Sequence, residues 1–378
     1  MKSALYLLRN EKLSKHTQSD DVNEKNVHLA LCFGSKYLLQ GNTVFDLLKN
    51  KFPSAHIITC STAGEIYNTE VLDDTVSIST IEFEDTHIES RFIEIDDYKD
   101  SFEAGAALLN KFPQENLSYL LVLSDGSKVN GSELVRGLND ISQHKILITG
   151  GLAGDGDGFN STLVGLNEPP REGIITAIGF YGDRIMVNHG SQGGWEIFGP
   201  ERFVSKSIGN QLFKIDEKNA LETYKKYLGP DAEGLPSSAL LFPLSVKIPD
   251  AEQSVVRTIL SIDEEKGSMT FAGDIPQGSY VRFMKANFDK LTSAASTAAI
   301  QTQGKKPPKL ALLISCVGRK LILQSRIDEE VEAVDDVFDH KTLLTGFYSY
   351  GEISPFVTGS NCQLHNQTMT ITTFDEMI

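Results

Sequence analysis

The sequence contains little cysteine and little tryptophan. It has four cysteines and one tryptophan in 378 residues. The cysteines form no CxxC or CxxCH motif, so zinc ribbons, thioredoxin-like centres and c-type haem attachment are unsupported. We therefore expect free, mostly buried thiols at Cys32, Cys60, Cys316 and Cys362.

Long hydrophobic runs are also absent. No apolar run approaches the roughly 20 residues that an α-helix needs to span a bilayer. The N-terminal stretch MKSALYLLRNEKLSKH is apolar only over residues 4–8, and it has neither a secretory apolar core nor a small-residue cleavage site. These features predict a cytoplasmic protein without a membrane segment.

Positive charge is scarce relative to negative charge. The chain has 35 Lys and Arg against 51 Asp and Glu, which gives a net charge of -16 at pH 7. Such a surface repels nucleic-acid phosphates and anionic lipids, so we expect neither as a partner. The remaining composition is ordinary for a globular protein, and the length suits two domains.

Three segments, residues 28–66, 118–156 and 309–353, share one plan. Each begins with an apolar run followed by Gly-Ser-Lys or Gly-Arg-Lys, continues through a polar or helical stretch, and ends in a second apolar run. The second run always turns at a glycine that precedes an acid. These acids are Glu65, Asp155 and Glu352.

This plan is typical of a strand–helix–strand unit of about 30 residues, in which the two strands are parallel. Both glycine turns then fall at one end of the sheet, where ligands of open α/β folds bind. We predict an α/β fold of two domains with mixed β-sheets built from repeated strand–helix–strand units. The three acids either anchor a ligand there or hold the turns through backbone N–H bonds.

The domain boundary is placed between the second and third units. The intervening chain is rich in predicted strands and turns until residues 216–230, which have the apolar spacing of a helix that Asp216 can cap. We therefore predict domains at residues 27–215 and 216–373.

The stretch CSTAGEI raises the question of nucleophilic catalysis. Cys60 or Ser61 at a strand end could attack a substrate, as in a hydrolase or transferase. The other two units repeat the glycine and the acid but not the thiol. We therefore favour a turn that shapes a pocket, with Glu65 more informative than Cys60, and expect no enzymatic activity.

The histidines offer one metal candidate. His56, His144 and His340 open the second strand of each unit, at the end of the sheet opposite the glycine turns. His189 instead ends an apolar strand and precedes glycine-rich loops and Trp195. A haem needs one axial imidazole, so His189 is the predicted haem ligand, although a lone histidine is more often structural.

Several motifs together resemble the FIST family of bacterial sensory proteins. The motifs are CSTAGEI, GGLAGDG, LETYKKYLG, GFYSYGEISPF and LHNQTM, and the resemblance extends from about residue 27 to 373. It implies an N-terminal and a C-terminal FIST domain that bind a small ligand, with amino acids and related metabolites suggested. The family's GEI and HNQT segments correspond to residues 351–353 and 365–368.

The resemblance also implies a signalling role. Some stand-alone members bind haem, sense nitric oxide and regulate a partner histidine kinase. We therefore predict a stand-alone sensor that acts in trans on a histidine kinase or other signalling protein, with haem-based nitric oxide sensing as the sharper version. A non-haem sensor of metabolites is the first alternative. The predicted ligand-binding residues are Glu65, Asp155, Tyr348, Tyr350, Glu352, His365 and Asn366.

Overall fold

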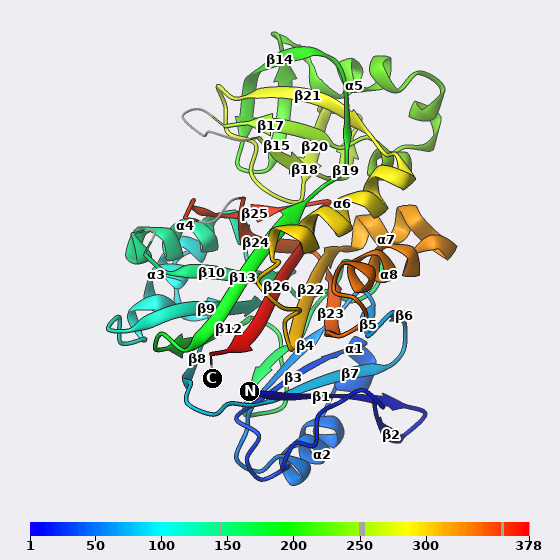
Figure 1. Cartoon of the computed structure of the whole chain (residues 1–378). Coiled ribbons are helices and arrows are strands. Elements are labelled where there is room, and N and C mark those ends of the chain that lie inside the picture. Colours follow the sequence, from blue (N-terminus) through cyan, green and yellow to red (C-terminus); the bar gives the residue numbers. More distant parts are fainter. Residues whose placement is uncertain (144, 249–253, 357–358, 378) are drawn as a thin grey trace.

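The computed structural model describes residues 1–143, 145–248, 254–356 and 359–377 (Figure 1). An α/β body of three six-stranded sheets occupies the lower part of the view, and a smaller eight-stranded β structure lies above it. We call the smaller part, residues 196–285, the β-module. The chain enters it after one sheet strand of the body and returns to the body through a helix.

The three predicted units are present, and each pairs its two strands in parallel. This confirms the predicted α/β class and the repeat. The strands are β3 (Leu29–Gly34) with β4 (His56–Ser61), β9 (Leu117–Ser124) with β10 (Leu147–Leu152), and β22 (Leu310–Cys316) with β23 (Leu343–Ser349). The helices between them are α1 (Lys36–Leu39) and α2 (Thr43–Lys51), α4 (Gly131–Ser142), and α7 (Val317–Leu323) with α8 (Asp328–Val337).

After each unit, the chain crosses into the sheet of another unit. The first unit continues into β5 (Glu65–Tyr67), which pairs with β23 of the third. The third continues into β24 (Gly351–Pro355), which pairs with β10 of the second. The second continues into β11 (Val164–Leu166), which pairs with β4 of the first. The body is therefore a closed ring with approximate threefold symmetry.

The remaining strands extend the three sheets in the same order. The first strand of each unit has an antiparallel neighbour, followed by an outer strand. The neighbours are β7 (Val76–Glu82), β12 (Ile174–Tyr181) and β26 (Met369–Glu376). The outer strands are β1 (Lys2–Arg9), β8 (His87–Glu94) and β13 (Ile185–Gln192). One further strand extends each sheet: β2 (Lys12–Lys15) beyond β1, β25 (Cys362–His365) beyond β24 and β6 (Glu70–Leu72) beyond β5.

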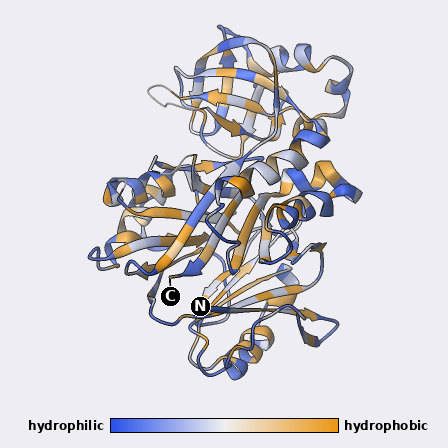
Figure 2. Ribbon diagram, viewed as in Figure 1, coloured by the Kyte–Doolittle hydropathy of each residue, from blue (hydrophilic) through white to orange (hydrophobic). Residues whose placement is uncertain are grey.

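Strand alternation explains the layers of the body. Residues such as Leu31, Leu121 and Leu312 point inward and form one apolar core between the three sheets. In this core, the rings of Phe33 and Phe347 stack with centroids 4.8 Å apart. The alternate residues face outward and are covered by helices, including α3 (Ser101–Asn110) and α6 (Phe288–Gln301). Figure 2 shows apolar residues along many of the strands of the body and a mixture of apolar and polar residues along its helices.

The β-module has its own core around Leu212, Tyr224 and Phe283. Its sheet runs β18-β17-β21-β14-β15-β20-β19, with β16 paired to β15. The strands are β14 (Glu196–Ile208), β15 (Gln211–Ile215), β16 (Lys218–Asn219), β17 (Leu244–Lys247), β18 (Val255–Arg257), β19 (Ile259–Asp263), β20 (Ser268–Phe271) and β21 (Tyr280–Lys285).

The predicted helix at residues 216–230 appears as α5 (Ala220–Leu228), and its predicted cap is wrong. Asn219, not Asp216, accepts the N–H of Glu222 at the helix start. Asp216 has a positive φ of 50° and instead binds the N–H of Phe203, because the chain is still turning between β15 and β16 there. The division into 27–215 and 216–373 stays a prediction; in space it falls between these two paired strands.

The four cysteines are free and buried, as expected from their spacing. Among the described residues, no helix combines the length and apolar character that a membrane crossing requires.

Candidate functional site

The turns that follow the second strands interlock at the centre of the ring. We call residues 61–65, 152–155 and 349–352 the first, second and third elbows. Their contact confirms that the glycine turns share one end of the sheets. The backbone bonds run from Ala63 N–H to the Tyr348 carbonyl (2.8 Å), from Gly154 N–H to the Ser61 carbonyl (2.9 Å), and from Tyr350 N–H to the Leu152 carbonyl (3.1 Å).

Glu65 closes the first elbow with a buried carboxyl group. One oxygen accepts the Thr62 hydroxyl at 2.6 Å, and the other accepts the Thr75 hydroxyl at 2.8 Å and its N–H at 3.2 Å. Burial raises the pKa of Glu65 to about 7, against the lowering effect of these hydrogen bonds. The acid therefore stabilises the turn and exchanges its proton near neutral pH.

Glu352 has the equivalent arrangement in the third elbow. Its oxygens accept the Ser349 hydroxyl at 2.7 Å and the Thr368 hydroxyl at 2.9 Å. The side chain is fully buried, which raises its pKa to about 8. Glu352 thus holds the turn from inside the protein.

Asp155 is different, because its carboxylate binds a residue of another unit. One carboxylate oxygen accepts the N–H groups of Asn160 and Ser161 at 3.1 Å and lies 3.9 Å from Lys36 Nζ. The other accepts the Tyr350 hydroxyl. Asp155 therefore connects the second elbow to the third and to the helical turn after β3.

The first elbow cavity has a volume of about 400 Å³ and contains Glu65 and Asp155 together. Strand ends from two different units thus supply two predicted site residues to one cavity. Gly64 has a φ of +145° there, and a Cβ would lie 2.6 Å from Lys320 Nζ. The other lining residues are Ser35, Lys36, Tyr37, Gln40, Thr62, Ala63, Gly64, Asp73, Asp74, Gly156, Gly158 and Asn160.

The second elbow cavity has a volume of about 310 Å³ and lies between the body and the β-module. Tyr350 forms part of its wall. The body also contributes residues 126–131, Leu152 and Phe159, and the module contributes Asn210, Leu260 and residues 271–274. The loop 155–160 thus separates the two elbow cavities.

Tyr348 and its neighbours form a buried ionic network that the sequence did not reveal. The Tyr348 hydroxyl donates to Glu330 at 2.6 Å, and Arg319 pairs with Glu330 at 2.7 Å. Arg319 also donates to the carbonyls of Gly193 and Leu291 at 2.7 and 2.9 Å. All three side chains are fully buried, so Tyr348 organises the fold and lines neither elbow cavity. In the sequence, the one sign of this network is that the third unit has Arg319 where the other two units have a serine.

His365 and Asn366 are also fully buried and outside both elbow cavities. His365 Nε2 contacts the Ser354 carbonyl at 2.9 Å, and its ring stands edge-on to Phe356 with centroids 4.5 Å apart. Burial lowers the pKa of His365 to about 4. Its Nδ1 and the Asn366 side-chain oxygen have no hydrogen-bond partner in the described chain.

His189 lies on β13 between two sheets of the body and is 5% exposed. Burial lowers the pKa of its imidazole, and a hydrogen bond to the Pro355 backbone opposes this. Its Nε2 has no partner among the described residues, which suits an axial ligand. The imidazole is nevertheless enclosed by protein and lines neither elbow cavity, so its surroundings do not fit a haem in this conformation.

Two other histidines of the sequence analysis, His56 and His340, lie at the opposite end of the sheets. His56 opens β4 and contacts the Ser90 hydroxyl at 2.7 Å, next to a groove of about 450 Å³. His340 is exposed and contacts Asp335 at 2.7 Å. His144 lies outside the described residues. No group of three or more metal-ligating side chains occurs within the described ranges.

Cys60 and Ser61 offer no accessible nucleophile. The Cys60 thiol is fully buried, which raises its pKa well above the usual range. The Ser61 hydroxyl donates to the Gly154 carbonyl at 2.7 Å and accepts the Leu163 N–H at 2.8 Å. The Ser61 side chain therefore stabilises the junction of the first two elbows, whereas Cys60 packs in the apolar core.

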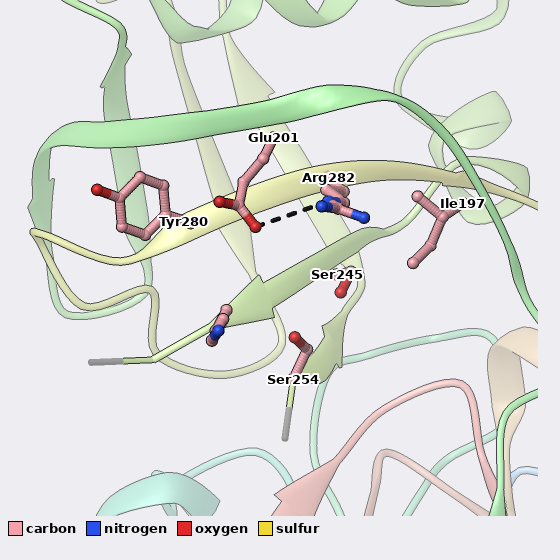
Figure 3. Close-up of a pocket in the computed structure, with 7 residues that line it drawn as sticks. Ile197, Glu201, Ser245, Ser254, Tyr280 and Arg282 are labelled. Carbon is pink, nitrogen blue, oxygen red and sulfur yellow. Dashed lines mark ion pairs between the residues drawn. The ribbon is translucent and has the colours of Figure 1, made fainter. Parts of the chain in front are cut away.

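A further cavity of about 220 Å³ lies in the β-module (Figure 3). It forms where β14 loses register with β21 between Phe198 and Arg202, and Glu201 pairs with Arg282 at 3.6 Å. None of the predicted site residues lines it. Its lining is Ile197, Glu201, Ser245, Lys247, Ser254, Tyr280 and Arg282.

Comparison with known families agrees with this architecture of interlocked elbows. Residues 28–218 match the FIST N domain, and residues 220–355 match the FIST C domain. The chain belongs to the FIST family. FIST domains are sensor domains of signal transduction that bind small ligands, and they are sensory rather than catalytic. Comparison with functionally described proteins gives no significant match.

Proposed function

We propose that this FIST protein senses a small ligand in the first elbow cavity and regulates a partner signalling protein, such as a histidine kinase, in trans. One observation carries the proposal: Glu65 and Asp155, from different units of the ring, line the same cavity at the carboxyl ends of the strands. Open α/β sheets bind ligands at this position.

The charges of the cavity favour a ligand with a cationic amine. Four acids line it, Glu65, Asp73, Asp74 and Asp155, whereas Lys36 is the one basic lining residue and Lys320 borders it. Lys36 Nζ lies 3.9 Å from the Asp155 carboxylate, which is a long ion pair. The ammonium group of a ligand could therefore take the place of Lys36 beside Asp155. Amino acids and related metabolites supply such a group.

Asp155 offers a path from ligand to output. Its carboxylate faces Lys36 in the cavity and also binds the Tyr350 hydroxyl in the FIST C region. A ligand that competes for Asp155 would move the loop 155–160, which contributes to the wall facing the β-module. The β-module would then change its position relative to the body, and this change would alter the contact with the partner signalling protein.

Thermal unfolding with a matched ligand panel tests the proposal. Amino acids and simple amines are compared with their N-acetyl derivatives, which lack the positive charge. We expect an amine to raise the Tm of the wild type, Asp155→Asn to abolish the rise, and the exposed control Asp231→Asn to retain it. The proposal fails if N-acetylation has no effect or if Asp155→Asn responds like the control.

Haem-based nitric oxide sensing is a second candidate; the unpartnered Nε2 of His189 favours it, whereas the enclosed position of the ring in this conformation opposes it. When bound, haem would supply the iron that binds nitric oxide. An absorbance spectrum of protein from haem-supplied cells tests it, with His56→Ala as the control at the far end of the sheet. A Soret band lost only in His189→Ala supports the candidate. Absence of the band in the wild type rejects it.

A further inference from the structure

Lys36, Lys128 and Lys320 are the lysines of the three Gly-Ser-Lys or Gly-Arg-Lys motifs, and they lie two residues after β3 and four residues after β9 and β22. Two of them reach the elbow of the next unit in the ring. Lys36 contacts Asp155 and Ser161 beyond the second elbow. Lys320 donates to the Ala63 carbonyl at 2.9 Å and pairs with Asp73 beside the first elbow. The carboxylate that Lys36 meets is the elbow acid Asp155, whereas the one that Lys320 meets is Asp73, outside the elbow.

Lys128 does not reach the third elbow. Its Nζ lies 3.7 Å from Glu172 and 4.0 Å from Asp96, and its side chain is 43% exposed. These contacts are about as long as the contact of Lys36 with Asp155, but Glu172 and Asp96 are 44% and 81% exposed, so they contribute little to stability and a bound anion can compete for Lys128. The acid of the third elbow, Glu352, is unavailable because Ser349 and Thr368 hold it inside the protein.

Lys128 and the third elbow meet at the second elbow cavity. Lys128 and Tyr350 both line it. The remaining walls include a flat aromatic surface, since Phe159 stacks on Tyr350 with centroids 4.5 Å apart and planes inclined by 18°. Phe159 is nevertheless 45% exposed, and Leu260 of the β-module is 44% exposed. Such exposed apolar side chains around a cavity are typical of a binding site.

We propose that the second elbow cavity binds a small aromatic carboxylate. The ligand's carboxylate would pair with Lys128 in place of its long, exposed contacts with Glu172 and Asp96, and its ring would lie against Phe159. Asp274 also lines the cavity and binds Asn130 at 3.2 Å, so its charge disfavours ligands with a second anionic group. This site is distinct from the amine site in the first elbow cavity, and its assignment does not rest on the proposed function.

The site lies between the body and the β-module, so a ligand bound there could affect the position of the β-module. Asn210 and residues 271–274 of the module close one side of the cavity. A bound ligand would contact both the module and the body, and would therefore favour one pose of the two. The loop 155–160 presents Asp155 to the first cavity and Phe159 to the second, so the two sites are coupled.

Fluorine NMR titration of the full chain tests this assignment. The probe is 4-fluorophenylacetate, with the neutral 4-fluorophenylacetamide as its charge control. We expect the carboxylate to bind about tenfold more tightly than the amide, because a hydrogen bond to a charged partner is lost in the amide. Equal binding of the two probes, or no binding of either, would overturn the proposal.

Three variants locate the binding. Lys128→Met and Phe159→Ala change exposed side chains and should each weaken binding of 4-fluorophenylacetate about tenfold. Lys36→Met removes the equivalent lysine of the first cavity and should leave this binding unchanged. The assignment is wrong if Lys128→Met binds like the wild type, or if Lys36→Met loses as much affinity. Neither result depends on an amine response, so this proposal and the proposed function fail separately.

Discussion

Asp155 and Tyr350, 195 positions apart in the sequence, bind each other in both directions. The Tyr350 hydroxyl donates to the Asp155 carboxylate, and the same oxygen accepts the Asp155 N–H at 3.1 Å and the Phe159 N–H at 3.0 Å. The two residues belong to the FIST N and FIST C regions. A single hydroxyl group therefore fixes the loop that separates the two elbow cavities.

Tyr350→Phe tests the role of this hydroxyl. The variant keeps the aromatic stack with Phe159 but leaves the two N–H groups and the carboxylate without their partner. We expect a loss of about 1–3 kcal/mol in the free energy of unfolding and faster hydrogen exchange at residues 155–161. Urea unfolding and hydrogen-exchange mass spectrometry measure both. Tyr280→Phe, at an exposed site of the β-module, is the control, and equal effects of the two variants would contradict the role.

The buried elbow acids predict an unusual pH dependence. Folding raises the pKa of Glu65 from 4.5 to about 7 and that of Glu352 to about 8, so the folded protein binds more protons than the unfolded chain in this interval. Stability from these groups is complete below about pH 4.5 and decreases as the pH rises through 7 and 8, by about 1.4 kcal/mol per unit of pKa shift.

Urea unfolding between about pH 5 and 8 measures this decrease. Glu65→Gln and Glu352→Gln imitate the protonated acids, so each should flatten the curve. Glu376 has a pKa lowered to about 2, and its contribution changes only at lower pH. A curve that stays equally steep in the double variant would show that other groups determine it.

The Arg319–Glu330 pair should be costly to break from one side. Arg319→Met leaves the Glu330 carboxylate buried without its partner, and we expect a loss of about 3–5 kcal/mol. The double variant Arg319→Met with Glu330→Gln removes the buried charge and should recover part of that loss. Arg326→Met is the matched surface control and should cost under about 1 kcal/mol, because Arg326 is 41% exposed. Additive losses in the double variant would contradict a direct ionic contact.

Cys60 should be chemically inert in the native protein. Its buried thiol has a raised pKa, and it donates only a weak contact to the Ser61 carbonyl at 3.4 Å. We expect iodoacetamide to label it only after unfolding, as measured by mass spectrometry. We also expect Cys60→Ala to keep the ligand responses of the wild type. Rapid labelling under native conditions would revive the enzymatic alternative.

The sequence predicted the three strand–helix–strand units because their signals are local. Each unit repeats apolar runs, the Gly-Ser-Lys or Gly-Arg-Lys turn and the final glycine with its acid. The residue that caps α5 was harder to predict, because asparagine and aspartate cap helices equally well. Asn219 is the cap because the chain is still paired as β16 up to that residue, and the helix starts after it.

The crossing of strands between units could not be predicted in the same way. β5, β11 and β24 are short apolar segments whose partners are set by the packing of the whole ring. For the same reason, sequence alone could not separate Asp155, which faces a cavity, from Glu352, which is held inside by Thr368. The burial of His365 and Asn366 also follows from this tertiary arrangement.

The ring also constrains how the chain acquires its structure during synthesis. β10 leaves the ribosome long before its partner β24, and β5 long before β23. Until residues 343–355 arrive, these strands expose unpaired backbone groups and apolar side chains. The FIST N region is therefore incomplete as a folding unit, and its nascent form depends on protection until the C-terminal strands close the ring.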